Sequence, residues 1–145
     1  MEIYTIGFAG KSAAEFFGLL KAAGIRRLID IRLNNTSQLA GFTKADNLPY
    51  FLKELCDIDY VHEPLLAPTK EIFDAYKKDG IDWPEFERRY RETLVERQVE
   101  VVLDRSLFAS RVVLLCSEST ADQCHRRLVA EYLREKWHDI QITHL

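Results

Sequence analysis

The sequence predicts an α/β fold: a single three-layer Rossmann-like domain over residues 1–145, built on a mainly parallel five-stranded sheet. Three observations predict it. Short β-rich apolar runs alternate with segments of helical periodicity along the chain. The run RVVLLC at 111–116 is almost continuously apolar, as expected of a strand covered on both faces. No repeat, low-complexity stretch or Gly/Ser-rich linker divides the 145 residues.

The first elements follow from local signals. Ile3–Gly7 is a short β-rich run that ends in glycine, which predicts the first strand. Ser12 and Glu15 have the spacing of a capping box, and they predict a helix that ends at Gly24. The run RLIDI at 27–31 predicts the second strand.

The later elements continue the alternation of strand and helix. Asp82 and Glu85 have capping spacing, and Phe86, Tyr90 and Leu94 follow at four-residue intervals on one predicted helix face. The other predicted elements are helices over about 48–56, 69–78 and 120–137 and strands over 59–62, 111–116 and 140–144.

The segment LLCSESTADQCHRR, residues 114–127, follows the fourth predicted strand. In open parallel sheets, ligands bind beyond the carboxyl ends of the strands, where the strand order reverses. We therefore expect Cys116 and Glu118 to lie at that edge, in one crevice with Asp30 and Arg32 from the end of the second strand.

Composition narrows the class of protein. Hydrophobic residues make up 47% and charged residues 30%, and the formal net charge is −3. This balance disfavours nucleic-acid binding through bulk charge and leaves binding through a local patch open. No apolar run has the length of a membrane span and no signal-peptide pattern is present, which predicts a cytoplasmic protein.

The three cysteines are an odd count with no CxxC spacing, so we predict no disulfide framework and no cofactor. The spacing does not call for a metal either, and it leaves open whether Cys116, Cys124 and His125 bind one. Cys116 ends a strand before a predicted helix start, where a thiolate is stabilised. Alternatively, it is a small apolar residue at the end of a buried strand. Cys124 lies four residues before Leu128 and eight before Tyr132, which predicts a buried, unreactive thiol and makes Cys116 the more accessible one.

Glu118 is a candidate catalytic carboxylate, acting as a general base or a nucleophile, because Ser119 and Asp122 already supply a helix cap. His125 either points back to the strand ends or bonds to backbone. A phosphatase loop is excluded, since it needs arginine where this chain has Asp122.

Asp30 and Arg32 share one side of the second strand's end. They form either a structural ion pair or an anion contact in which Arg32 reaches over the crevice, with Ser37 among the neutral hydrogen-bonding groups of the following loop.

Taken in order, YTIGF, DIR with a following serine, GF at 41–42, LLCSE and CHRRLVAEYL resemble the domain of unknown function 488 family over nearly the whole chain. The resemblance implies the fold and the location of the site but no reaction. Its pattern falls on Thr5, Gly7, Asp30, Arg32, Ser37, Cys116, Glu118, Cys124, His125 and Arg126.

These residues leave three hypotheses open. The first is a hydrolase or transferase that acts on a nucleotide, nucleoside or nucleic-acid end, with Glu118, Cys116 and His125 catalytic and the ligand held by Gly7, Asp30, Arg32, Ser37 and Arg126. The second is a non-catalytic module that binds a small anionic or nucleotide-like ligand, or nucleic acid, in the same crevice. The third is a thiol-based sensor that uses Cys116.

Overall fold

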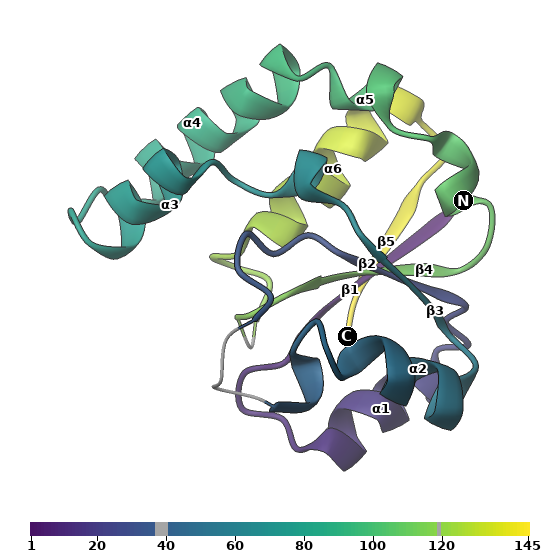
Figure 1. Ribbon diagram of the computed structural model, residues 1–145. Helices are drawn as coiled ribbons and strands as arrows, with labels where there is room; N and C mark the ends of the chain where they lie inside the picture. The colour runs from purple at the N-terminus through teal and green to yellow at the C-terminus, as the bar shows by residue number, and fades with distance from the viewer. Residues whose placement is uncertain (37–40, 119) are drawn as a thin grey trace.

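The computed structural model describes residues 1–36, 41–118 and 120–145. It confirms the predicted α/β fold, because within these residues five strands form one sheet with every pair parallel, in the order β3-β2-β4-β1-β5 (Figure 1). The strands are β1 (Glu2–Gly7), β2 (Arg27–Asp30), β3 (Asp59–His62), β4 (Val112–Cys116) and β5 (Gln141–His144).

Helices cover both faces of the sheet. Figure 1 shows α1 (Ala13–Ala22) and α2 (Leu48–Cys56) on one face and α6 (His125–Trp137) with the short α5 (Val99–Val102) on the other. The remaining helices, α3 (Lys70–Lys77) and α4 (Trp83–Glu96), form a hairpin that projects beyond the sheet. No helix in the described part of the chain is long and apolar enough to cross a bilayer.

The two faces carry two separate apolar cores, because successive side chains of a strand point to opposite faces. In β4, Leu114 and Cys116 belong to the core under α4, α5 and α6, whereas Val113 and Leu115 belong to the core under α1 and α2. Every residue of β4 is buried. The prediction of a strand covered on both faces is therefore confirmed.

Local signals identified most of the element boundaries. The Ser12 hydroxyl accepts from the Glu15 backbone N–H at 3.1 Å, and a Glu15 carboxylate oxygen accepts from the Ser12 N–H, which completes the predicted capping box. Asp82 caps α4 in the same way, accepting from the Glu85 N–H at 3.0 Å. Gly24 has a φ of +69°, a conformation that glycine adopts without steric cost after a helix end.

The start of α6 differs from the prediction. The helix begins at His125 rather than near Thr120, and its N-cap is Cys124, whose side chain makes no capping hydrogen bond. Ser119, the predicted cap, lies outside the described residues. Residues 120–124 form turns because distant contacts hold the preceding loop: Ala9 N–H donates to the Ser117 carbonyl at 2.9 Å, and Arg126 Nη1 donates to the Glu118 carbonyl at 2.6 Å.

The topology brings two diverging loops together. β1 and β4 are neighbours in the sheet, yet β1 leads to α1 on one face and β4 leads to α6 on the other. This divergence is the switch point at which open α/β sheets bind ligands. The sequence segment after Cys116 therefore lies where the fold favours a site.

Candidate functional site

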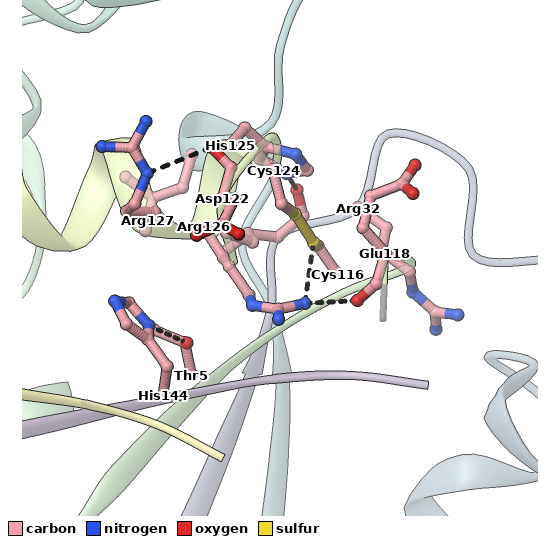
Figure 2. The surroundings of a disulfide bond; sticks show 12 residues. Thr5, Arg32, Cys116, Glu118, Asp122, Cys124, His125, Arg126, Arg127 and His144 are labelled. Atoms are coloured by element: carbon pink, nitrogen blue, oxygen red, sulfur yellow. Dashed lines mark hydrogen bonds between the residues drawn. A yellow bond between two sulfur atoms is a disulfide. The ribbon is translucent and has the colours of Figure 1, made fainter. Parts of the chain in front are cut away.

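The centre of the site is a pair of cysteines. Cys116 ends β4 and Cys124 is the N-cap of α6, and their sulfur atoms form a disulfide (Figure 2). Both residues are buried, with 1% of Cys116 and 3% of Cys124 exposed. Cys124 is therefore buried as predicted. The expectation that no disulfide framework forms missed this bond, and the prediction that Cys116 is the more accessible thiol is wrong.

The physical reason lies in the loop. Because residues 120–123 form turns and the helix begins only at His125, Cys124 occupies the N-cap position beside β4 instead of the second helical turn. A separation of eight residues matches no common cysteine motif, so local spacing did not reveal the pair.

His125 bonds to backbone, as the second of the two predicted alternatives expected, and the bonded carbonyl lies at the strand ends to which the first expected it to point. Its Nε2 lies 2.8 Å from the carbonyl oxygen of Ile31, just past the end of β2, and its ring packs edge-on against Tyr90. Burial lowers the pKa of His125 to about 4. The ring is thus neutral at physiological pH, with its proton on Nε2 donated to the carbonyl and Nδ1 carrying the free lone pair.

Arg126 is a fully buried cation beside the cysteines. Its Nη1 donates to the Glu118 carbonyl oxygen and lies 3.6 Å from the sulfur of Cys116 (Figure 2). Its Nε has no hydrogen-bond partner among the described residues. Burial lowers the pKa of Arg126 to about 10, so the guanidinium remains charged at neutral pH.

Gly7, one of the predicted ligand contacts, has a packing role in the structure. A Cβ atom at this position would lie 1.5 Å from the Glu118 carbonyl oxygen and 2.3 Å from Arg126 Nη1. The absence of a side chain lets the loop after β4 settle directly on the end of β1. The space between these two strand ends is consequently filled by protein.

A small pocket lies beside the cysteines. It has a volume of about 50 Å³, is partly open to solvent and lies between the α3–α4 hairpin and the segment from β4 to α6. Cys116, Cys124 and His125 line one side, and aromatic side chains line the other, namely Phe73, Tyr76, Trp83 and Phe86. Tyr76, Trp83 and Phe86 pack together with ring centroids 4.9–5.8 Å apart. This aromatic wall was missed by sequence reasoning, and its one visible signal was the pair Tyr76 and Trp83 flanking the turn at Gly80.

Glu118 lies on the rim of this pocket. Its carboxylate pairs with Lys77 Nζ at 2.9 Å, and 47% of its side chain is exposed. The carboxylate does not cap α6, which starts seven residues later. It is therefore available to a ligand that enters from the side of α3.

Asp30 and Arg32 lie at the predicted edge but on the opposite face of the sheet. Asp30 pairs in register with Leu115, whose side chain faces α1 and α2, while Cys116 faces α6. The expectation of one crevice shared with Cys116 is therefore wrong. Register decides it, because residues one apart in a strand point to opposite faces.

Arg32 is committed to internal partners and is only 3% exposed. Its Nε and Nη2 donate to the two oxygens of Asp30, each at 2.8 Å, and Nη2 also donates to the Thr43 carbonyl at 2.6 Å. The Tyr60 hydroxyl donates to Asp30 Oδ2 at 2.6 Å, and burial together with this carboxylate raises the pKa of Tyr60. The structural ion pair, the first of the two alternatives, is thus the one observed. Ser37 lies outside the described residues.

On the far side of Arg126, Thr5 and His144 form a further polar contact. The Thr5 hydroxyl is 2.5 Å from His144 Nδ1, and Figure 2 shows both residues below the Arg126 guanidinium. Burial and the Arg126 charge lower the pKa of His144. This pair ties β1 to β5 and lies away from the cysteines.

Comparison with known proteins identifies the family. The family described as "Domain of unknown function DUF488" matches residues 12–133, a range that includes both cysteines, Glu118 and the aromatic wall. No curated protein and no solved structure matches the chain. The match covers well over half of the sequence and confirms the resemblance in the motifs around Cys116 and Cys124. The chain belongs to the DUF488 family, whose description assigns it a domain and no reaction.

Proposed function

We propose that the protein is a thiol-based redox sensor in which Cys116 and Cys124 alternate between two thiols and a disulfide. The observation that carries the proposal is the juxtaposition of the two sulfurs by a strand end and a helix start. Free cysteines in apolar cores are inert, whereas this pair lies beside a cation and a pocket.

Arg126 favours the reactive form of the reduced pair. A guanidinium 3.6 Å from the sulfur of Cys116 stabilises a thiolate more than a thiol, and the thiolate is the nucleophile in disulfide chemistry. Cys116 is accordingly the attacking residue and Cys124 the resolving one. Arg126 bonds the Glu118 main chain, and no described carboxylate accepts a hydrogen bond from its guanidinium.

The burial of the cysteines favours a small oxidant such as a peroxide. Cys116 and Cys124 are only 1% and 3% exposed and line a small pocket, so a small molecule reaches their sulfurs more readily than the thiol of a second protein does. The Cys116 thiolate attacks one peroxide oxygen, the O–O bond breaks, and water leaves after taking up a proton, so that a sulfenic acid remains. The Cys124 thiol then attacks that sulfur, the disulfide forms, and a second water leaves.

The switch acts on the loop between the cysteines. In the disulfide form the N-cap of α6 is tied to the end of β4, and the loop contacts both Gly7 and Ala9 of the β1 segment. Reduction removes this tie, so the two redox forms differ at the sheet edge where a partner or ligand would meet the protein.

Counting thiols tests the sensor. The reduced protein, alkylated after denaturation, is expected to carry three adducts by intact-mass spectrometry. After treatment with hydrogen peroxide it is expected to carry one, mapped to Cys56. Three adducts after peroxide treatment, or a loss of thiols that treatment with a reductant does not reverse, would contradict the proposal.

Cys56 provides the matched control. It is the remaining cysteine of the chain and is partly buried, and burial raises the pKa of its thiol, which keeps it protonated. Cys56→Ser is therefore expected to form the disulfide at the rate of the parent. Cys116→Ser and Cys124→Ser are expected to form none.

A second candidate function is favoured by the aromatic wall. Aromatic rings beside a carboxylate suit a planar base, and base–aromatic stacking contributes about 1–3 kcal/mol per base. In this alternative the protein is a hydrolase or transferase that acts on a nucleoside, a nucleotide or a nucleic-acid end. Glu118 is the base or nucleophile, and Lys77 contacts the anionic part of the ligand. A site that binds such a ligand without chemistry would use the same wall.

The Glu118→Gln variant tests whether Glu118 is catalytic, as the second candidate function requires. Because the Glu118–Lys77 pair is half exposed, its loss is expected to change the free energy of unfolding by no more than about 1 kcal/mol. A melting curve is therefore expected to shift by about 2–4 °C at most. Any turnover found in a nucleoside and nucleotide screen is expected to disappear in Glu118→Gln and to persist in Glu92→Gln, an exposed carboxylate of α4 that pairs with Arg88. Turnover that survives Glu118→Gln would rule out its catalytic role.

A further inference from the structure

We propose that the reduced protein binds a zinc ion through Cys116, Cys124 and His125. Their potential ligand atoms all lie within 4.8 Å of one another, and both cysteines are buried. Two thiolates and an imidazole are the donor types that zinc prefers. The inference does not rest on the proposed redox function, although the same sulfurs serve both.

The backbone holds the two thiols at a separation that suits a shared ion. At Zn–S distances of about 2.3 Å, two sulfurs on a tetrahedral ion lie about 3.8 Å apart. The Cα atoms of Cys116 and Cys124 are 7.4 Å apart, so the side chains reach this sulfur separation without movement of the strand or the helix. The ligands come from the end of β4 and the start of α6, two rigid elements of the domain.

The surroundings of His125 prepare it as a ligand. Nε2–H donates to the Ile31 carbonyl, which leaves the lone pair of Nδ1 as the free donor. Metal-bound histidines usually donate their other N–H to a carbonyl or carboxylate in this way, which fixes the tautomer and the ring orientation. The edge-on contact with Tyr90 restricts the ring further.

Charge favours a divalent ion with an affinity for sulfur. Two thiolates carry a charge of −2, which a zinc ion balances, and the Arg126 cation 3.6 Å from the Cys116 sulfur stabilises that thiolate. Hard ions such as magnesium and calcium prefer oxygen ligands and gain little here. The described residues provide these three donors, and a fourth position would open toward the pocket whose rim carries Glu118.

The test uses the full-length chain, reduced and freed of metal with a chelator. Titration with cobalt, a spectroscopic substitute for zinc, is expected to produce the strong absorption of cobalt–thiolate bonds at one ion per chain. Competition with a chromogenic chelator then measures zinc affinity. Cys116→Ser, Cys124→Ser and His125→Gln are expected to weaken zinc binding by more than about 100-fold. Cys56→Ser and His62→Gln are expected to bind like the parent.

A measurement without substitutions covers the case in which a variant fails to fold. Peroxide oxidation of the parent protein is expected to abolish cobalt absorption, and reduction is expected to restore it, because a disulfide has no thiolate to offer. Zinc is also expected to protect two of the three thiols from alkylation. If the reduced parent gives no cobalt–thiolate absorption, or if the absorption persists after oxidation, the zinc site is ruled out.

The two proposals fail separately. A disulfide that forms with peroxide in a protein that binds no cobalt overturns the zinc site and leaves the sensor in place. Cobalt binding at the cysteines in a protein that forms no disulfide with peroxide overturns the sensor and leaves the zinc site in place.

Discussion

Replacing Asp30 by alanine is expected to lower the free energy of unfolding by about 3–5 kcal/mol, because the substitution leaves the Arg32 cation buried without its carboxylate. Two charged hydrogen bonds of 2.8 Å are lost, and the Tyr60 hydroxyl loses its 2.6 Å acceptor as well. Since a domain of this kind is stable by about 5–15 kcal/mol in total, this loss is a large part of its stability. Urea unfolding followed by circular dichroism measures it.

Asp59→Ala is the matched control. Asp59 is an exposed carboxylate on the neighbouring strand, paired with Lys53, so its loss is expected to cost about 0–1 kcal/mol. Removing both charges, as in Asp30→Leu with Arg32→Met, is expected to recover most of the stability that Asp30→Ala loses. An Asp30→Ala protein within 1 kcal/mol of the parent would show that the pair does not hold the end of β2.

Secondary structure could be predicted from the sequence because its signals are local. The predicted helix at 48–56 and strand at 59–62 match α2 and β3 in the structure, and two predicted helix starts are capped as expected. Apolar periodicity and capping act within a few residues, so they are readable without knowledge of the fold. The parallel sheet follows from the alternation of strand and helix.

The face on which each site residue lies could not be predicted in the same way. β2 has apolar residues on both faces, so its pattern does not say whether Asp30 points toward α2 or α6. The structure decides this through the register with β4, a contact between segments about 85 residues apart in the chain. The same limit applies to the pocket, which forms only where the aromatic residues of the α3–α4 hairpin meet the segment from β4 to α6.

The start of α6 shows a tertiary contact overriding a local signal. Asp122 and the preceding serine have the composition of a helix start, yet the helix begins after Cys124. Two hydrogen bonds hold the segment that precedes the helix. Ala9, far away in the sequence, donates to the Ser117 carbonyl, and Arg126, on α6 itself, donates to the Glu118 carbonyl. The pairing of Cys116 with Cys124 depends on the conformation of the same loop, so it could not be predicted from their eight-residue separation alone.

The contact that organises this loop leads to the last prediction. Gly7→Ala is expected to destabilise the protein by about 3 kcal/mol, because a Cβ atom would lie 1.5 Å from the Glu118 carbonyl oxygen. The obstacle is main chain and cannot rotate away as a flexible side chain would. Moving it also breaks the 2.6 Å bond from Arg126 and displaces the guanidinium beside Cys116. We therefore expect slower disulfide formation with peroxide as well as an earlier urea midpoint.

Gly18→Ala provides a control of opposite sign. Gly18 lies on the exposed side of α1, and a Cβ atom there meets nothing within 4 Å. Alanine in an exposed helix interior is expected to raise the free energy of unfolding by about 0.5–1 kcal/mol without changing the cysteines. Comparing Gly7→Ala with Gly18→Ala thus separates the entropic effect of alanine on the backbone from the steric clash that a Cβ atom causes at Gly7. If Gly7→Ala is as stable as the parent and forms its disulfide at the parent's rate, the close approach of the two loops does not shape the site.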